Sequence, residues 1–207
     1  MATLKQAIVI GAGAAAASLA LAGAVPRQAQ GDLRGAAEKT IASWPEESKK
    51  AGEAMLAKYG APSVVGEKLI VWHGNGPWIE TVLMRDPIDH RWPKPHKDVL
   101  AQSIHYRVPV ERFDDLVEYD GSIIAERTRG TLSARCDKEE MNYLAINLAN
   151  DVATGKKTVA QARQAYVEAV MAFMKGEKPE YTTGLRFSVA SGGTGDPDQP
   201  ESKIGAQ

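Results

Sequence analysis

The alternation of hydrophobic and polar residues after position 43 predicts an α+β domain. Leu132, Ala134 and Cys136 alternate with polar residues, as expected for a strand with one buried face. The expected strands cover residues 64–72, 79–84, 104–108, 122–128, 131–136 and 185–189. Short turns join several of them, so we expect an antiparallel sheet of about five to six strands.

Helical spacing of apolar residues predicts helices on both sides of these strands in the sequence. An N-terminal helix should follow Ser43 and end near Gly60. A C-terminal helical pair should begin at Asp137 and at Thr158, and Thr158 has capping-box spacing with Gln161. The pair is joined by a short loop, which predicts antiparallel packing. We therefore expect the sheet to pack against a C-terminal helical hairpin and an N-terminal helix.

Two segments show neither the alternation of a strand nor the apolar spacing of a helix. Residues 85–98, RDPIDHRWPKPHKD, contain three prolines and few apolar residues, and an exposed loop is expected there. From Ser191 onward glycine, proline and acidic residues dominate, so residues 191–207 are expected to be a disordered tail.

The run of small and apolar residues from Ala7 to Val25 is typical of a secretory signal peptide. Lys5 precedes it, and the next charged side chain is Arg27. We expect a signal peptide over residues 1–30, cleaved at about residues 24–30, then a flexible leader over 31–42 and a single domain over 43–190. The expected location is periplasmic or secreted. Membrane contact is expected only if the leader is uncleaved.

The same run permits a different interpretation. Gly11, Gly13 and Ala16 fit the pattern G-x-G-x-x-G/A, and Asp32 follows at roughly the distance of a ribose-binding acid. A cytoplasmic dinucleotide-binding protein would use these residues. However, no apolar strand precedes Asp32, and no regular βαβ alternation follows, so the signal peptide is favoured.

Charge and cysteine content narrow the classes of partner. The chain has 25 basic and 26 acidic residues, and loss of Lys5 and Arg27 with residues 1–30 would change the net charge from −1 to −3. This balance argues against a nucleic-acid partner. Cys136 is the only cysteine, so an intrachain disulfide is excluded. Stability must come from packing, a metal or a partner.

Aromatic and polar residues gather in two expected loops. Trp72, His73, Asn75 and Trp78 surround a hairpin tip, and Trp92 lies in the proline-rich segment. Aromatic rings supply contact area and polar neighbours orient a ligand. The favoured function is therefore non-enzymatic binding of a small molecule or a periplasmic protein at these residues. Alternatively, Trp72 and Trp78 pack across the hairpin.

The histidines suggest a second function. We consider His90, His96 and His73 as ligands of a transition metal, with Cys136 as a soft ligand, because zinc and copper accept imidazole and thiolate. A periplasmic metal-binding protein or metalloenzyme would follow. The spacing matches no standard metal motif, and neither G-x-S-x-G nor S-x-x-K occurs, so no catalytic residue is assigned.

Overall fold

The computed structural model describes residues 27–201. In it, the strands form one antiparallel sheet, and helices pack against this sheet. The strands are β1 (Val64–Val65), β2 (Leu69–Asn75), β3 (Trp78–His90), β4 (His96–His105), β5 (Ile123–Glu126) and β6 (Thr131–Cys136). The helices are α1 (Arg27–Ile41), α2 (Glu46–Tyr59), α3 (Phe113–Tyr119), α4 (Glu139–Ala153) and α5 (Val159–Met174). Short 3-10 helices cover Val110–Arg112 and Glu180–Thr182.

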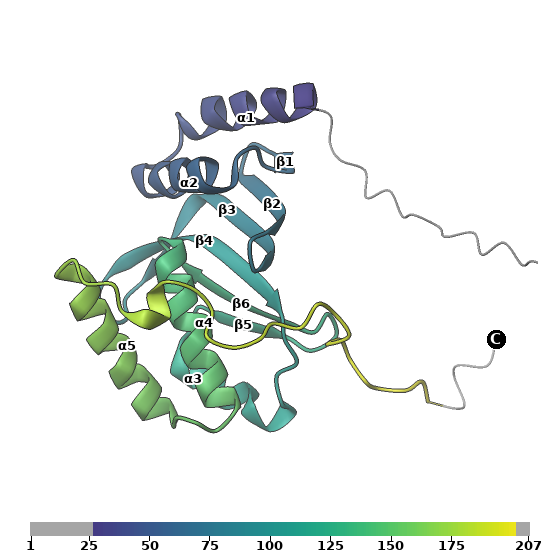
Figure 1. Cartoon of the computed structure of the whole chain (residues 1–207), viewed down its shortest axis with the longest axis vertical. Coiled ribbons are helices and arrows are strands. Elements are labelled where there is room, and N and C mark those ends of the chain that lie inside the picture. Colours follow the sequence, from purple (N-terminus) through teal and green to yellow (C-terminus); the bar gives the residue numbers. More distant parts are fainter. Residues whose placement is uncertain (1–26, 202–207) are drawn as a thin grey trace, which may run out of the picture.

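The sheet order within the described residues is β1-β2-β3-β4-β6-β5, and each neighbouring pair is antiparallel. Helices α1 and α2 pack at the β1–β4 end, whereas α4 crosses the β4–β6 end with α3 and α5 beside it (Figure 1). The predicted α+β class is confirmed, including the N-terminal helix α2 and the helical hairpin formed by α4 and α5.

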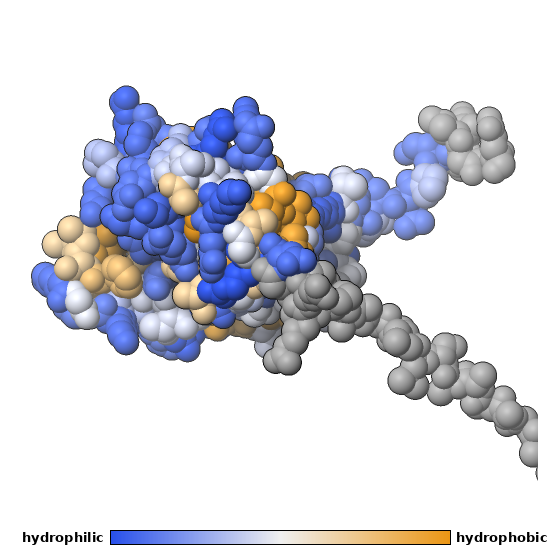
Figure 2. Space-filling model, turned by 90° about the horizontal axis from the view of Figure 1, so that it is seen from above, coloured by the Kyte–Doolittle hydropathy of each residue, from blue (hydrophilic) through white to orange (hydrophobic). Residues whose placement is uncertain are grey.

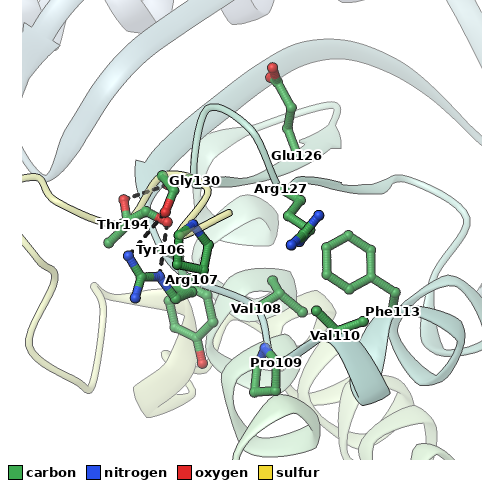
Figure 3. Close-up of a pocket in the computed structure, with 12 residues that line it drawn as sticks. Tyr106, Arg107, Val108, Pro109, Val110, Phe113, Glu126, Arg127, Gly130 and Thr194 are labelled. Carbon is green, nitrogen blue, oxygen red and sulfur yellow. Dashed lines mark hydrogen bonds between the residues drawn. The ribbon is translucent and has the colours of Figure 1, made fainter. Parts of the chain in front are cut away.

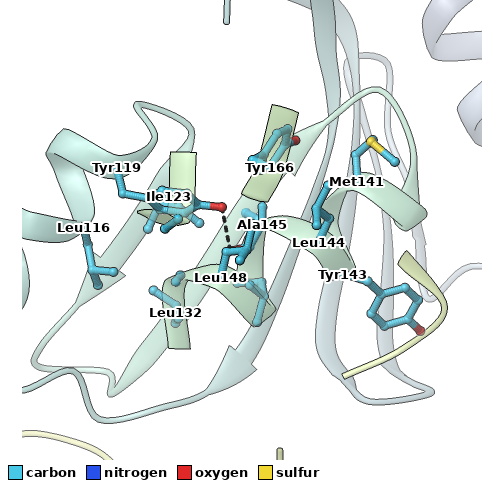
Figure 4. Close-up of a cluster of buried hydrophobic side chains, with 14 of the residues drawn as sticks. Leu116, Tyr119, Ile123, Leu132, Met141, Tyr143, Leu144, Ala145, Leu148 and Tyr166 are labelled. Atoms are coloured by element: carbon cyan, nitrogen blue, oxygen red, sulfur yellow. Dashed lines mark hydrogen bonds between the residues drawn. The ribbon is translucent and has the colours of Figure 1, made fainter. Parts of the chain in front are cut away.

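Helix α4 lies at the centre of the larger core. Its predicted apolar stripe, which includes Met141, Leu144 and Leu148, is buried (Figure 4). The other faces are covered as well, and every residue of α4 except Glu140 is buried. The covering elements are α3, α5, the 3-10 helix at 180–182 and the sheet. The helical spacing of apolar residues predicted one buried face of α4. In the structure, the surrounding elements bury the other faces as well.

Residues 31–41 are helical, which corrects the expected flexible leader over 31–42. They belong to α1, whose Ala37 and Ile41 are almost fully buried. Ile41 and Trp44 belong to a smaller core with Met55 and Leu56 of α2. Burial of these apolar side chains stabilises a segment whose own helical signal is weak.

Residues 85–98 are mostly strand, which corrects the expected loop. Strands β3 and β4 pair His90 with His96, so only residues 91–95 form the connection. Pro87 falls where the register shifts between Leu83 and Ile88. A bulge tolerates proline because a ladder hydrogen bond is already missing there.

Three smaller expectations also differ from the structure. Asp137 was expected to begin α4, but Lys138 is the N-terminal cap and makes no side-chain capping bond. The helical turn after Pro109 is expected to bury Val117 beside Leu116, whereas Val117 is 67% exposed. Residues 185–189 are not a strand, although Leu185, Phe187 and Val189 pack against the larger core. This segment contacts helices rather than a free sheet edge, so it has no ladder to join.

The C-terminal segment is irregular but attached as far as residue 198. The guanidinium of Arg107 donates to the carbonyl oxygens of Gly193, Thr194 and Gly195 at 2.9–3.2 Å. The Thr194 hydroxyl donates to the Gly130 carbonyl at 2.7 Å. The expected disorder over 191–207 is therefore wrong for this part, and residues 202–207 lie outside the described residues.

The expected signal peptide lies almost entirely outside the described residues, as do Gly11, Gly13 and Ala16. Asp32, by contrast, lies within α1 and not at the end of a strand. A ribose-binding acid follows a strand of a mostly parallel sheet, whereas the described strands pair antiparallel. Between residues 27 and 201, no helix has the length and apolar character to cross a bilayer.

Seen from the α1 side, the surface is largely hydrophilic, with separate hydrophobic areas (Figure 2). Single exposed apolar residues such as Val110 are ordinary on a folded domain.

A buried carboxylate joins the two parts of the core. Glu139, at the start of α4, is 5% exposed. It accepts hydrogen bonds from Lys58 and Tyr59 of α2, from Trp78 Nε1 at 2.7 Å and from Gln102 Nε2 at 3.1 Å. Burial alone would raise the pKa of Glu139, but these donors outweigh it and hold the pKa below its usual value.

We expect Glu139→Gln to lower the free energy of unfolding by roughly 2–3 kcal/mol at pH 7, because a satisfied charged acceptor is lost. Glu140→Gln is the matched control, since Glu140 is adjacent and exposed. Urea denaturation measures both. The folded-state pKa is depressed, so the contribution is present above the unfolded pKa and lost as pH falls through the folded value. The difference between the wild type and Glu139→Gln should therefore shrink below about pH 4. Equal losses in the two variants would contradict this role.

A second test concerns the β5–β6 turn. Gly130 has φ +66°, and a Cβ there would lie 2.2 Å from the Thr194 carbonyl. Gly130→Ala should destabilise the fold by about 1–3 kcal/mol and loosen residues 193–198. Thermal unfolding and limited proteolysis report these two effects. In the control Gly121→Ala, the new Cβ meets no atom within 4 Å. Undiminished protection of the C-terminal segment in Gly130→Ala would show that the close approach is unimportant.

Candidate functional site

The tryptophans expected at a binding surface are mostly core residues. Trp72 is 2% exposed and donates through Nε1 to the Gly60 carbonyl at 3.1 Å. Trp78 is 1% exposed, stacks on Tyr143 and donates to Glu139. The expectation that these side chains form an exposed ligand surface is wrong, because helices α2 and α4 cover them. Both rings are buried, but they do not pack across the hairpin as the alternative interpretation expects, because they belong to separate core clusters.

The remaining members of that expected surface are also separated. Asn75 is buried and donates to Thr81 at 2.9 Å. Trp92 packs against Tyr166, with the Arg163 guanidinium 4.2 Å from its ring centroid. Trp92 therefore anchors the β3–β4 connection to α5. His73 is exposed on β2, with Nδ1 3.6 Å from Glu80.

His90 and His96 are brought together by the pairing of β3 and β4. They are register partners, and their ring centroids are 4.7 Å apart. Asp98 lies two residues after His96, so it projects from the same face of β4. Ligand atoms of His90, His96 and Asp98 all lie within 4.8 Å of one another. His73 does not join this group, because it lies on β2 beside Glu80.

Asp98 was missed because its segment was expected to be a loop. Once residues 96–105 are read as a strand, His96 and Asp98 have the spacing of two that places both on one face. This spacing could have indicated that Asp98 lies beside His96, but the prolines at 93 and 95 favoured a loop.

The separations suit a tetrahedral ion. His96 Nε2 lies 3.1 Å from Asp98 Oδ1, and His90 Nδ1 lies 3.4 Å from Asp98 Oδ2. Cys136 Sγ is 3.4 Å from the same His96 nitrogen. Zinc bonds of 2.0–2.3 Å in tetrahedral geometry set ligand atoms roughly 3.3–3.6 Å apart. An ion could therefore be bound with small adjustments of these side chains.

The hydrogen bond at Nδ1 of His96 determines which tautomer the ring adopts. Nδ1 is 2.9 Å from the Lys94 carbonyl oxygen, which can only accept, so we place a proton on Nδ1. Nε2 then faces the Asp98 carboxylate, another acceptor, and needs a second proton or a cation. The Asp98 carboxylate raises the pKa of His96 for this reason. Asp98 Oδ1 is buried and accepts no hydrogen bond from the described residues.

Further acidic and polar groups enclose the pair. Asp120 is 3% exposed, and its Oδ1 lies 3.6 Å from His90 Nε2. Burial raises the pKa of Asp120. The Ser122 hydroxyl donates to Asp98, and Arg135 Nε lies 3.8 Å from Asp98. Arg135 pairs with Asp98 alone, so the two buried carboxyl groups favour a further positive charge beside His90 and His96.

Cys136 is poorly suited to act as a nucleophile. It is 4% exposed, and burial raises the pKa of its thiol well above the usual value, with Asp137 and Asp98 adding to the effect. Reactive cysteines instead have electropositive, accessible surroundings. The contact with His96 therefore does not amount to a Cys-His catalytic pair. A bound cation would favour the thiolate here.

Two openings reach the histidines from different sides. A cleft of about 540 Å³ is lined by His90, His96 and charged residues that include Glu47 and Lys97. An apolar pocket of about 140 Å³ is lined by His96 and Cys136, together with side chains of α4 and α5. His96 thus borders both solvent and an apolar space.

Another pocket, of about 210 Å³, lies between the end of β4, the β5–β6 hairpin and the C-terminal segment (Figure 3). Its two arginines already have internal partners. Arg107 binds the carbonyls of residues 193–195, and Arg127 pairs with Asp196 at 3.2 Å and with Asp198. The pocket is therefore a weaker candidate for anion binding.

Comparison of this chain with protein-family models, with curated proteins and with solved structures finds no match.

Proposed function

We propose that this domain binds a divalent transition metal ion, zinc in the first place, through His90, His96 and Asp98. The observation that carries the proposal is the contact of the buried Asp98 Oδ1 with His96 Nε2 at 3.1 Å, which needs either a proton on Nε2 or a cation between the two atoms. A cation bound between these atoms satisfies both. Two imidazoles, a carboxylate and a nearby thiol form a mixed N/O/S set that zinc accepts readily.

The ligands are held in place before an ion arrives. His90 and Asp98 project from paired strands, and the Lys94 carbonyl orients the His96 ring. Ser122 holds the Asp98 carboxylate. Outer partners of this kind fix ring orientation and raise metal affinity. The binding site therefore costs little reorganisation.

Three protein ligands leave one tetrahedral position open, as in sites where zinc binds a further molecule. Cys136 would close that position if its thiolate became a ligand. The two arrangements differ in function, since a closed site stabilises a fold and an open one can bind a small molecule. Substitution with Co²⁺ separates them, because a thiolate-to-cobalt charge-transfer band appears only if Cys136 is a ligand.

The wild-type protein, stripped with EDTA and reloaded, should bind about one zinc ion per chain. His96→Ala, His90→Ala and Asp98→Asn should each weaken binding by at least about tenfold, because each removes a ligand atom. Calorimetric titration with zinc and elemental analysis after dialysis measure affinity and stoichiometry, and circular dichroism confirms folding.

His73→Ala is the matched control, because His73 lies outside the cluster and should leave zinc affinity unchanged. Absence of stoichiometric zinc in the wild type would refute the proposal. Equal losses in His73→Ala and His96→Ala would show that zinc binds nonspecifically to surface imidazoles.

We also propose that the protein is exported, on the evidence of Lys5 followed by the apolar run from Ala7 to Val25. A cut before Arg27 would keep α1 whole. Intact-mass spectrometry of the protein from its native host should show loss of about 24 to 30 residues, most simply ending before Arg27. A full-length mass, less at most Met1, would overturn this proposal.

A further inference from the structure

The apolar pocket beside His96 is formed by well-packed elements. Tyr166 and Val170 of α5 and Met141 of α4 are at most 9% exposed. The remaining lining residues are Pro93, Lys94, Pro95, Asp137, Lys138, Phe173 and Met174, together with His96 and Cys136. The β3–β4 connection that forms one wall is held by Trp92, which packs on Tyr166 and lies under Arg163. The pocket is thus pre-formed.

Its volume sets the size of an occupant. The pocket measures about 140 Å³ and is partly open to solvent, and benzene fills an enclosed apolar cavity of about 150 Å³ in another protein. A six-membered ring or a branched aliphatic group of similar size fits such a space. Apolar walls with a few polar groups at one end are typical of small-molecule sites.

The polar end of the pocket selects the head group. His96 and Cys136 are there, and Cys136 Sγ lies 3.4 Å from His96 Nε2, so an ion bound by that nitrogen would lie at this end of the pocket. Lys94 at the rim is exposed and makes no ion pair with the described residues, whereas Lys138 pairs with Asp137 at 2.7 Å. The positive charges of the metal ion and of Lys94 together favour binding of an anionic group at this end of the pocket. Without the metal, Asp98, Asp120 and Asp137 would repel one.

We propose that this pocket binds a small apolar monocarboxylic acid, of about the size of benzoate, whose carboxylate coordinates the metal and whose apolar body contacts Tyr166, Val170 and Phe173. The inference rests on the metal site proposed above, and it specifies the class of ligand that the site takes. The carboxylate occupies the coordination position that the three protein ligands leave open.

Calorimetric titration of benzoate into the full-length protein tests the proposal, with zinc-loaded and EDTA-stripped samples compared. Benzoate should bind the zinc-loaded protein, and its affinity should fall at least tenfold without zinc. Val170→Trp fills the pocket and should reduce benzoate affinity at least tenfold while leaving zinc content unchanged. Met171→Trp is the control, because Met171 is adjacent on α5 and 55% exposed. Val170→Phe replaces the tryptophan variant if that variant unfolds.

The possible failures are distinguishable. Stoichiometric zinc without benzoate binding would overturn the pocket assignment and leave the metal site intact, whereas absence of zinc would overturn the metal site itself. Equal benzoate affinity with and without zinc would refute coordination of the carboxylate. Equal binding of benzene and benzoate would refute the choice of head group. Unchanged affinity in Val170→Trp would show that benzoate binds elsewhere.

Discussion

The buried carboxylate of Glu139 is the constraint on which both parts of the core depend. Its donors come from α2, β3 and β4, and the carboxylate itself begins α4, so one side chain ties the smaller core to the larger one. A buried charge is costly unless its lone pairs are satisfied, which makes this geometry demanding. Cys136 ends β6 only three residues before Glu139. The connection from β6 to α4 therefore also places Cys136 beside His96.

The long β3–β4 hairpin positions the residues of the candidate site. Extension of both strands beyond the sheet centre places His90 opposite His96 and projects Asp98 from the same face. Trp92 then anchors the connection to α5, which limits the positions available to His96. Rigid strands and a packed connection position metal ligands more accurately than a free loop would. A metal site in this place is consistent with the architecture as a whole.

The two openings beside His96 suggest a division of roles. The cleft lined by charged residues gives a hydrated ion a route to the imidazoles, and the pocket lined by α4 and α5 offers space for the body of a small ligand. The tryptophan surface considered from the sequence has no such arrangement, since Trp72 and Trp78 are enclosed by helices. Ligand binding and metal binding, which are alternatives when only the sequence is considered, become parts of one proposed site around His96.

The sequence by itself determined the α+β class, the capping box at Thr158 and Gln161, and the buried stripe of α4, because these depend on local periodicity and on side chain to backbone bonds near in the chain. It also singled out His90 and His96, though with His73 as their companion. Tertiary structure alone decided that Asp98 joins them, that residues 85–90 extend β3, and that α1 forms against Trp44. Strand register, a bulge at Pro87 and burial against distant residues control these outcomes. The local spacing of His96 and Asp98 can indicate a shared strand face, but not which distant residues pair with that strand or pack against it.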